Sequence, residues 1–390
     1  MKIGMVSEFY YPQPGGISEH IRALSRELRL LGHDVTVLTS RIRGEVPERD
    51  PRVLRLGRSL PLRYNGSLSR VTAGWRLGRR LEETLARERF DLLHVHNPLM
   101  PTLPLMATRR ARCPVVATFH SFYERDLLTW LFHGRLERRL GGLAARVPVS
   151  AAARSAVEPH FPGEYRIIPN GVDYEFFSEA ARREDDCLAG LTPGCLRLLF
   201  VGAAVRRKGL PQLLDAFAAL RLRREDVELI VVGDGPDRAR LQRRLPGHAR
   251  EAAHFVGFVP RQKLAEYYAS ADVFCAPSLG RESFGMVLLE AMAAGLPVVA
   301  FDIDGYRDVV RQGVEGLLVA PRDTAALARA VDWFLDRPEE RAAYGRRGQA
   351  RAEGLSWRVI ARRLEAVYHE ACGLPLPARE EAPRAAAAAT

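Results

Sequence analysis

Two carboxylates eight positions apart are the feature of this 390-residue sequence that most clearly indicates chemistry. Glu282 lies in a short polar stretch that ends at Gly285, and Glu290 lies in the apolar run that follows. We expect residues 285–288 to begin a helix, whose free N–H groups and positive dipole end favour an anionic ligand. The spacing therefore predicts a site for an anionic ligand that carries hydroxyl groups. A glutamate pair alone would also suit a capped, solvated helix start.

Two further segments place glycines or cations where an expected strand ends. Gly15 and Gly16 follow the first strand and open a helix, so their backbone can approach a phosphate closely, although an ordinary strand–helix turn has the same composition. Lys208 follows an expected strand at 196–201. A compact cation there can neutralise a departing diphosphate. In another context the basic run that begins at Arg206 would be a solvated surface segment.

Smaller signals lie at the ends of three other expected strands. His120 follows the strand at 115–119, where a histidine can donate to a sugar hydroxyl, and a satisfied structural histidine fits the same position. Gly233, Phe258 and Val259 follow two later strands, where the backbone can approach a ribose or a base, or can simply turn. Ligands bind at the carboxyl ends of parallel strands, so these positions are candidates for one shared site.

The segment from Glu282 to Gly295 resembles the E-x7-E motif of the family 4 glycosyltransferases, which are retaining nucleotide-sugar enzymes with the GT-B fold. The resemblance implies that Glu282 binds the hydroxyls of the donor sugar and that Glu290 binds the ribose. It implies catalytic roles for Glu282, His120 and Lys208. The donor-binding residues that it implies are Gly15, Gly16, Arg206, Lys208, Gly233, Phe258, Val259, Glu282, Ser283, Phe284, Gly285 and Glu290.

The chain departs from the family pattern after Gly202. Most relatives carry an arginine directly after this glycine, whereas this chain has Ala203. Either Arg206 or Arg207 reaches the phosphates instead, or phosphate stabilisation is weaker. Enzymes of this type are generally thought to react on one face of the sugar, with the leaving phosphate assisting deprotonation of the acceptor, so we do not assign His120 as a general base.

Within family 4, the sequence is most similar to the phosphatidylinositol mannosyltransferases, over nearly its whole length. This resemblance implies transfer of mannose from GDP-mannose to the inositol ring of an anionic membrane lipid. Two alternatives stay open: a soluble family 4 enzyme with another nucleotide-sugar and a non-lipid acceptor, or a non-catalytic nucleotide-sugar-binding relative. The segments that carry the resemblance are Lys2–Val6, Pro14–Gly16, Val116–His120, Ile168–Asp173 and Ala271–Pro277.

One basic stretch bears on the acceptor. We expect an amphipathic helix over 68–89, with basic residues beside a tryptophan, which suits the surface of an anionic membrane. A core-facing apolar stripe with solvated arginines fits this stretch equally well. A second candidate for lipid contact is the segment 130–139. The residues concerned in the first stretch are Arg70, Trp75, Arg76, Arg79 and Arg80.

Strand-like and helix-like segments alternate along the chain, which predicts an α/β architecture with parallel sheets. With the resemblance, we expect the GT-B fold: two Rossmann-like, doubly wound domains that face a central cleft. The pattern breaks at Pro169-Asn170-Gly171, so we place an acceptor-side domain at 1–170 and a nucleotide-sugar domain at 171–355. In the resembled fold the last helix, 356–372, packs back on the first domain. Residues 375–390 are predicted to be disordered.

The composition limits the classes of binding partner that we expect for this protein. A net charge of +11 favours anionic partners, but there is no nucleic-acid motif, so we expect no nucleic-acid partner. No apolar window is long enough to span a membrane and no signal peptide is recognisable, which predicts a cytoplasmic protein, with peripheral contact to the inner face of the plasma membrane for a lipid acceptor.

The resemblance implies no tightly bound cofactor, with a divalent cation as a stimulant. His94 and His96 share a strand's period, but no third metal ligand is evident, so no metal site is expected.

Overall fold

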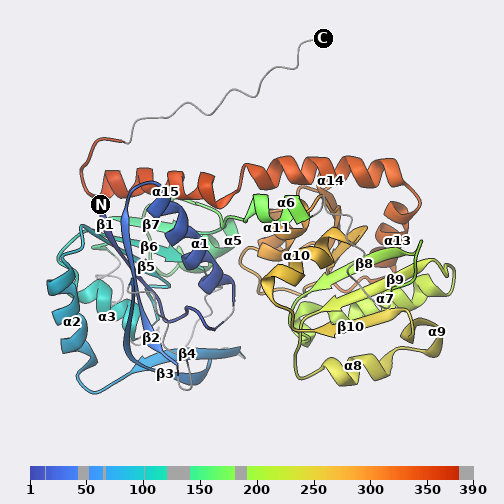
Figure 1. Cartoon of the computed structure of the whole chain (residues 1–390), viewed down its shortest axis with the longest axis horizontal. Helices are drawn as coiled ribbons and strands as arrows, with labels where there is room; N and C mark the ends of the chain where they lie inside the picture. The colour runs from blue at the N-terminus through green and yellow to red at the C-terminus, as the bar shows by residue number, and fades with distance from the viewer. Residues whose placement is uncertain are drawn as a thin grey trace, which may run out of the picture.

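The computed structural model describes residues 1–13, 15–42, 52–64, 67–100, 102–120, 141–180 and 191–376. These residues form two lobes, each built around one sheet, and the chain passes between the lobes twice (Figure 1). Each sheet has helices on both faces, and its strands are parallel except for one pair. The predicted α/β fold with two doubly wound, Rossmann-like domains is therefore confirmed.

The described part of the first lobe contains a seven-stranded sheet in the order β4-β3-β2-β1-β5-β6-β7. β1 lies in the middle and pairs in parallel with β2 and β5. The strands are β1 (Lys2–Val6), β2 (Asp34–Arg41), β3 (Val53–Tyr64), β4 (Ser67–Ala73), β5 (Leu92–His96), β6 (Val115–Phe119) and β7 (Ala145–Pro148).

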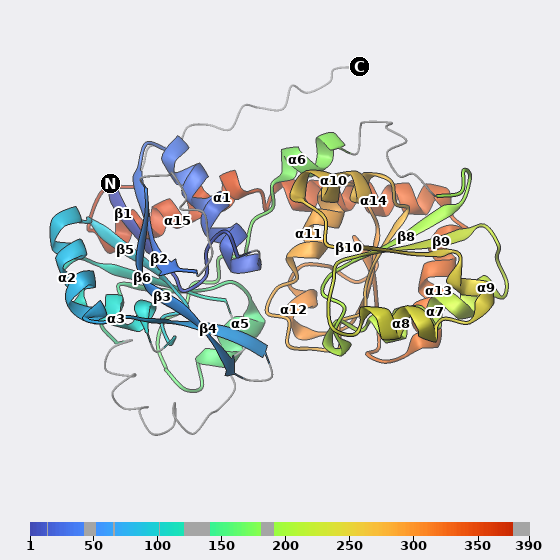
Figure 2. The same ribbon diagram turned by 60° about the horizontal axis from the view of Figure 1, so that its bottom comes forward.

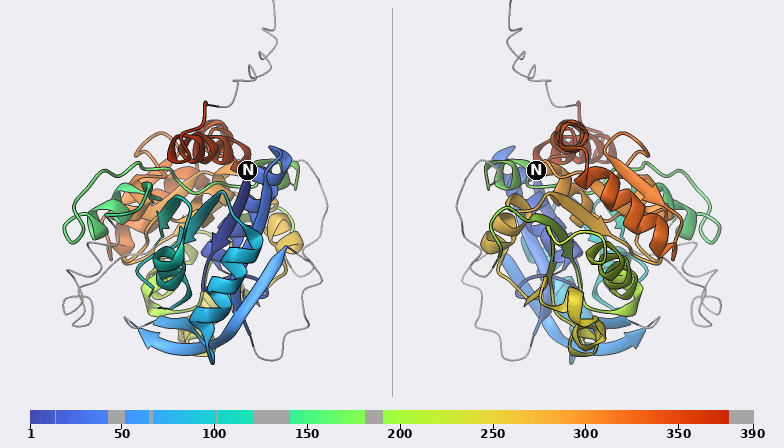
Figure 3. Two further views of the ribbon diagram at one scale, coloured as in Figure 1. Left: turned by 90° about the vertical axis from the view of Figure 1, so that its left-hand side faces the viewer. Right: turned by 90° about the vertical axis from the view of Figure 1, so that its right-hand side faces the viewer.

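Helices cover both faces of this sheet because its central strands are apolar on both sides. Ile3 and Met5 of β1 pack with α1 and α15, whereas Val6 packs on the opposite face with α2 and α3. Figure 3 views the lobe from its end and shows α15 along its top. The helices are α1 (Gly16–Leu30), α2 (Leu77–Glu88), α3 (Leu103–Arg110), α5 (Ala151–Val157) and, from the end of the chain, α15 (Trp357–Ala371).

The hairpin of β3 and β4 shows that the helix predicted over 68–89 is wrong in its first part. β4 pairs antiparallel with β3, and α2 begins only at Leu77. β-branched Val71 and Thr72 suit an edge strand better than a helix, which explains the difference. Arg70 consequently lies in the sheet, where its guanidinium donates to the Ser59 hydroxyl at 3.3 Å.

The second lobe contains, among the described residues, a six-stranded parallel sheet in the order β10-β9-β8-β11-β12-β13. The strands expected from the sequence are present, and β13 is an additional edge strand that pairs with β12. The strands are β8 (Leu196–Val201), β9 (Val227–Val232), β10 (Ala253–Gly257), β11 (Val273–Ala276), β12 (Val298–Phe301) and β13 (Gly316–Val319).

Helices also enclose this second sheet on both faces. Figure 2 shows α10, α11 and α14 on one side of it and α7, α8 and α13 on the other. Phe274 and Phe301 lie fully buried in the core between them. The helices are α6 (Tyr174–Ala180), α7 (Leu210–Arg221), α8 (Arg238–Arg244), α9 (Gly247–Arg250), α10 (Arg261–Ala269), α11 (Met286–Ala293), α12 (Asp304–Arg307), α13 (Thr324–Leu335) and α14 (Pro338–Glu353), with a short 3-10 helix, η1 (Arg206–Lys208).

The two crossings between the lobes lie side by side. The Val172 N–H donates to the Leu355 carbonyl, and the Trp357 N–H donates to the Val172 carbonyl, both at 3.0 Å. Beyond this point α15 returns to the first lobe, where Ile360, Leu364 and Tyr368 are buried against its sheet. The lobes are thus joined by paired backbone segments, and the carboxyl ends of both sheets lie toward the interface between the lobes.

Candidate active site

The start of α11 is a helix N-terminus at the interface between the lobes. Gly285 precedes the helix with a φ of +87°, in the left-handed region that favours glycine. A Cβ at this position would lie 2.6 Å from Cε1 of Tyr306, so no larger residue fits without displacing that buried ring. The sequence pattern placed the bend and the helix start here, and the structure agrees within one residue.

Glu282, just before this bend, is held by two cations from the loop after β8. Its Oε1 lies 2.9 Å from Lys208 Nζ and 2.5 Å from a terminal nitrogen of Arg207. The Ser278 hydroxyl donates to the same oxygen at 3.4 Å. The carboxylate and the two cations form one charged cluster, which we call the Glu282 cluster. Its three members come from two loops at the carboxyl edge of the second sheet.

An arginine further along this loop, rather than one at position 203, contacts Glu282. Ala203 is exposed, and Arg207 reaches Glu282 from η1, four residues further along the chain. Arg206 begins the same turn, and its side chain is exposed. Arg207 is therefore the arginine of this turn that contacts Glu282, and which of Arg206 and Arg207 reaches the phosphates stays a prediction.

Glu290 lies one turn inside α11 and has a different environment. The Tyr268 hydroxyl of α10 donates to Glu290 Oε2 at 2.9 Å. Burial raises the pKa of Glu290 to about 7, while the Tyr268 hydrogen bond and the more distant charge of Arg261 act in the opposite direction. This carboxyl therefore changes its charge near neutral pH, unlike an ordinary surface glutamate.

His120 meets the second lobe through its backbone. The Ser283 hydroxyl, directly after Glu282, donates to the His120 carbonyl at 2.5 Å. The imidazole is buried, and its Nε2 lies 2.9 Å from Nδ1 of His96. Burial lowers the pKa of His120 well below its usual value, so the ring is neutral. His120 and Glu282 are 162 positions apart in the sequence, and in the structure Ser283, the neighbour of Glu282, contacts His120 directly.

The glycine loop of the first lobe approaches the start of α11. Gly15 directly precedes α1, and a Cβ at Gly16 would lie 3.4 Å from the Met286 sulfur across the interface. Two helix N-termini, those of α1 and α11, therefore face the same region. Their free N–H groups make that region suited to a diphosphate.

The remaining predicted residues border the second sheet. Gly233 has a φ of +129°, and a Cβ there would lie 2.0 Å from the Gly202 carbonyl oxygen, so only glycine fits. Phe258, after β10, has 70% of its surface exposed, and Val259 beside it is half-buried. Phe284 differs from the expectation, because its side chain is 2% exposed and lies in the second-lobe core, which leaves only its backbone for a ligand.

Interactions that sequence reasoning missed hold the lobes together beside this site. Arg261 of α10 forms ion pairs with Glu19 of α1 and, at 2.9 Å, with Asp173 of the linker. Arg26 of α1 also contacts Asp173, at 3.2 Å. Nothing in the local sequence of Glu19 signals a partner 242 residues away.

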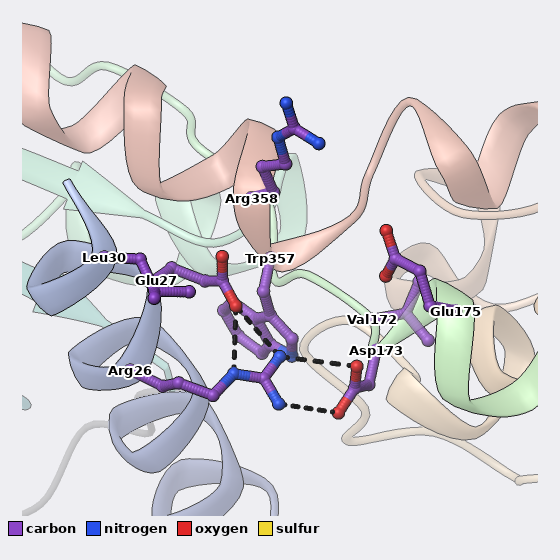
Figure 4. A pocket seen from close by; sticks show the side chains of 8 residues that line it. All are labelled: Arg26, Glu27, Leu30, Val172, Asp173, Glu175, Trp357 and Arg358. Carbon is purple, nitrogen blue, oxygen red and sulfur yellow. Dashed lines mark hydrogen bonds and ion pairs between the residues drawn. The ribbon is translucent and has the colours of Figure 1, made fainter.

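A surface hollow of about 280 Å³ lies at the crossing between the lobes, away from the Glu282 cluster. Figure 4 shows Arg26 between Glu27 and Asp173, with Trp357 forming the wall behind them. Arg26 pairs with both Glu27 and Asp173 in this hollow. It is part of the hinge, and the candidate site is the region between α1, α11 and the Glu282 cluster.

Comparison with known proteins identifies the family to which this chain belongs. Residues 14–176 match the model described as Glycosyltransferase Family 4, and residues 193–351 match the model described as Glycosyl transferases group 1. A phosphatidyl-myo-inositol mannosyltransferase from Mycolicibacterium smegmatis is 37% identical over 377 residues, covering 96% of this chain and 95% of the relative. The chain belongs to the family 4 glycosyltransferases. It is therefore a glycosyltransferase, and the resemblance predicted from its motifs is confirmed.

Other relatives show how widely this family's fold is used. A glycogen synthase from Mycobacterium tuberculosis is 30% identical, covering 94% of each chain. Among solved structures, sucrose-phosphate synthase from Thermosynechococcus elongatus matches with a TM-score of 0.75 at 24% identity, over 95% of this chain and 98% of that one. Anabaena HepE in complex with UDP matches with a TM-score of 0.74 at 19% identity, over 93% and 98%. These structural likenesses confirm the GT-B fold of this glycosyltransferase.

Proposed function

We propose that this glycosyltransferase is a retaining mannosyltransferase, which moves mannose from GDP-mannose to phosphatidylinositol or a related lipid. The observation that carries the chemistry is the Glu282 cluster, in which one carboxylate contacts two cations at the carboxyl edge of the second sheet. The choice of mannose and of an inositol lipid is supported by relatives named phosphatidyl-myo-inositol mannosyltransferase, which align over nearly the whole chain.

The donor would bind between the two helix N-termini. Its diphosphate would lie against the N–H groups of α1 at Gly16 and of α11, and would draw Lys208 and Arg207 away from Glu282. The freed carboxylate would then accept hydrogen bonds from the sugar hydroxyls. The ribose hydroxyls would bind Glu290, and the exposed face of Phe258 and the backbone at Val259 would lie beside the base.

Catalysis would depend on charge stabilisation rather than on a dedicated base. As the bond between the sugar and the diphosphate breaks, negative charge grows on the departing phosphate, and Lys208 and Arg207 are placed to stabilise it. A phosphate oxygen on the same face would take the proton of the acceptor hydroxyl, which retains the configuration of the sugar. His120 is neutral, so it would orient a donor hydroxyl by a hydrogen bond.

The acceptor side would use the surface beside α2. Leu77 and Leu81 of this helix are buried in the first-lobe core, so its apolar stripe faces inward. Trp75, however, is 85% exposed, next to three exposed arginines. Each basic residue near an anionic bilayer contributes about 1 kcal/mol of attraction. The arginines are Arg76, Arg79 and Arg80.

This geometry favours peripheral contact with a membrane, at the inner face of the plasma membrane if the protein is cytoplasmic. Among the helices that the structure describes, none has the length and apolar character needed to cross a bilayer. The second predicted lipid-contact segment, 130–139, lies outside the described residues.

Thermal stabilisation by nucleotides and co-sedimentation with vesicles test the two halves of this proposal separately. GDP and GDP-mannose should raise the melting temperature more than UDP and UDP-glucose do. Vesicles that contain phosphatidylinositol should bind the wild-type protein more strongly than a variant with Trp75→Ala and Arg79→Gln, and Arg244→Gln in the second lobe serves as a charge-matched control. Stabilisation by UDP-sugars only would refute the mannosyl assignment.

The relative named glycogen synthase favours a second candidate, a family 4 transferase with another nucleotide-sugar and a non-lipid acceptor. This candidate predicts transfer in the absence of lipid and equal vesicle binding by the wild-type protein and the Trp75 variant. The same two measurements therefore distinguish it from the lipid mannosyltransferase. Ala203 motivated a third candidate, a non-catalytic relative, and we propose that Arg207, which contacts Glu282 from the same loop, supplies the missing phosphate contact.

A further inference from the structure

Three histidines from separate elements of the first lobe meet behind the candidate active site. His20 comes from α1, His96 ends β5, and His120 follows β6. Their exposed fractions are 2%, 1% and 7%, and one ring nitrogen from each lies within 4.8 Å of the other two. The sequence showed only that two histidines share the period of β5. In the structure His94 is not a member of this group, and His20 and His120 lie beside His96 instead.

The hydrogen bonds of His20 leave a free lone pair inside this cluster. Its Nδ1 lies 2.8 Å from Oδ1 of Asn170, and because an amide oxygen only accepts, Nδ1 carries the hydrogen. Nε2 is then unprotonated, and it is buried with no hydrogen-bond partner in the part of the chain that the structure describes. A histidine whose other nitrogen donates to an oxygen acceptor is in the form that metal-binding histidines adopt.

His96 has the same kind of unpaired nitrogen. Its Nδ1 shares a hydrogen with His120 Nε2 at 2.9 Å, whereas its own Nε2 is buried and unpartnered among the described residues. Burial lowers the pKa of His20 to about 4 and the pKa values of His96 and His120 well below the usual range, and for His96 and His120 repulsion by other histidines adds to the effect. All three rings are consequently neutral imidazoles near pH 7, which is the protonation state that binds metals.

Neighbouring side chains fix the rings without competing for the free nitrogens. His94 contacts the Thr118 hydroxyl at 2.6 Å and the Tyr368 hydroxyl at 2.7 Å, so both of its nitrogens are occupied. Its ring packs on His96 with a centroid distance of 4.3 Å, and the Trp357 ring packs edge-on against His20 at 4.8 Å. His94 is therefore a supporting residue rather than a fourth ligand.

We propose that His20, His96 and His120 form a binding site for a divalent transition-metal ion of the zinc type. Three imidazoles suit Zn²⁺, Co²⁺, Ni²⁺ or Cu²⁺, whereas Mg²⁺ prefers oxygen ligands, so this site is distinct from any stimulation by Mg²⁺. Binding would disrupt the hydrogen bond between His96 and His120 and would give the unpaired Nε2 of His20 a partner. A fourth ligand position would remain for water.

The metal would also act on transfer, a consequence that rests on the proposed function. Coordination would turn the His120 ring away from the orientation that the donor sugar needs, so Zn²⁺ would inhibit. Inhibition that is lost on adding a chelator, in the protein that binds the metal, supports this consequence. Binding of the metal without inhibition would leave the metal site standing and would refute the contact between His120 and the donor.

Metal titration of the full-length protein, first stripped with a chelator, tests the site without relying on activity. Co²⁺ should bind with a stoichiometry of one and give the intense visible absorption of a tetrahedral site, and added Zn²⁺ should abolish that absorption by displacement. His20→Asn and His96→Asn should each weaken binding by about tenfold or more. His248→Asn, which alters an exposed histidine of the second lobe, should bind like the wild-type protein.

The two cluster variants are used together because either one alone can disturb folding. Melting curves recorded without metal show which variant keeps the wild-type fold, and Zn²⁺ should raise the melting temperature of the wild-type protein and of His248→Asn but not of a folded cluster variant. The proposal is overturned if the wild-type protein gives no tetrahedral Co²⁺ spectrum, or if it binds metal no more tightly than the cluster variants.

Discussion

The Ser283 hydroxyl donates to the His120 carbonyl at 2.5 Å and thereby ties the loop before α11 to the end of β6 in the other lobe. This contact brings the loop that carries Glu282 next to the backbone of His120. It is one of several links between the lobes, with the hinge, the ion pairs of Arg261 and the hydrogen bond from the Ala151 N–H to Asp308.

Removing this hydroxyl should reduce activity more than stability. Ser283→Ala deletes one partly buried hydrogen bond, so we expect a loss of about 1 kcal/mol in the free energy of unfolding. Misplacement of the donor should lower kcat/KM by about tenfold or more. Ser270→Ala removes a comparable hydroxyl at the end of α10 and should leave kcat/KM unchanged. Equal kinetics for the two variants would contradict the positioning role of Ser283.

The two neighbouring arginines of η1 should differ in their effects. Arg207→Met removes a cation that contacts Glu282, and kcat should fall by about a hundredfold if that cation stabilises the departing phosphate. Arg206→Met alters an exposed side chain in the same turn and should change kcat only slightly. Steady-state kinetics with saturating donor checks this contrast. A larger loss for Arg206→Met would restore the original assignment of Arg206.

Nucleotide affinity should rise with pH through the pKa of Glu290. The folded-state pKa of about 7 lies above the ordinary value of 4.5, so this group's contribution to stability is complete below pH 4.5 and is lost as the pH rises through about 7. The ionised form accepts ribose hydroxyls better, so GDP should bind more tightly at about pH 8 than at about pH 6. Calorimetric titration with GDP at several pH values measures this dependence.

Two variants identify the group responsible for that pH dependence. Glu290→Gln should bind GDP weakly with a flat profile across neutral pH. Tyr268→Phe removes the hydrogen bond that lowers the pKa of Glu290, so it should move the midpoint to higher pH. A wild-type profile in Glu290→Gln would show that another group titrates.

Arg261 should control how firmly the lobes are held together. Arg261→Gln removes the charge that joins Glu19 of the first lobe and Asp173 of the linker to α10, and we expect a loss of about 1–3 kcal/mol in the free energy of unfolding. Small-angle scattering should show a larger radius of gyration. Arg244→Gln breaks an exposed ion pair with Asp215 within the second lobe and should change neither quantity measurably. The same radius for both variants would argue against the interlobe role.

Local patterns predicted most of the fold and half of the site. The buried strands and the helix start at Gly285 depend on neighbours in sequence, and the structure has them where the patterns placed them. β4 was missed because the apolar residues of Ser67–Ala73 fit both a helical and a strand repeat. Its pairing with β3 is what makes this segment a strand. The position of Arg207 depends on the geometry of η1, which three consecutive basic residues do not reveal.

The histidine cluster and the Arg261 ion pairs could not be found in this way. Their members lie 24 to 242 positions apart, and the packing of α1, which carries Glu19 and His20, brings its members of both groups to the others. One signal was available: both His96 and His120 end strands that the alternating pattern makes adjacent and parallel. His20 lies within α1 rather than at the end of a strand, so the third member of the cluster was not predicted.

The most direct test of the central claim is the mass and anomeric configuration of the product made from GDP-mannose and phosphatidylinositol vesicles. We expect phosphatidylinositol with one added hexose in the α configuration, and about a hundredfold less of it with Glu282→Gln. A wild-type protein that forms no such lipid, or a Glu282→Gln variant that forms it at the wild-type rate, would contradict the account.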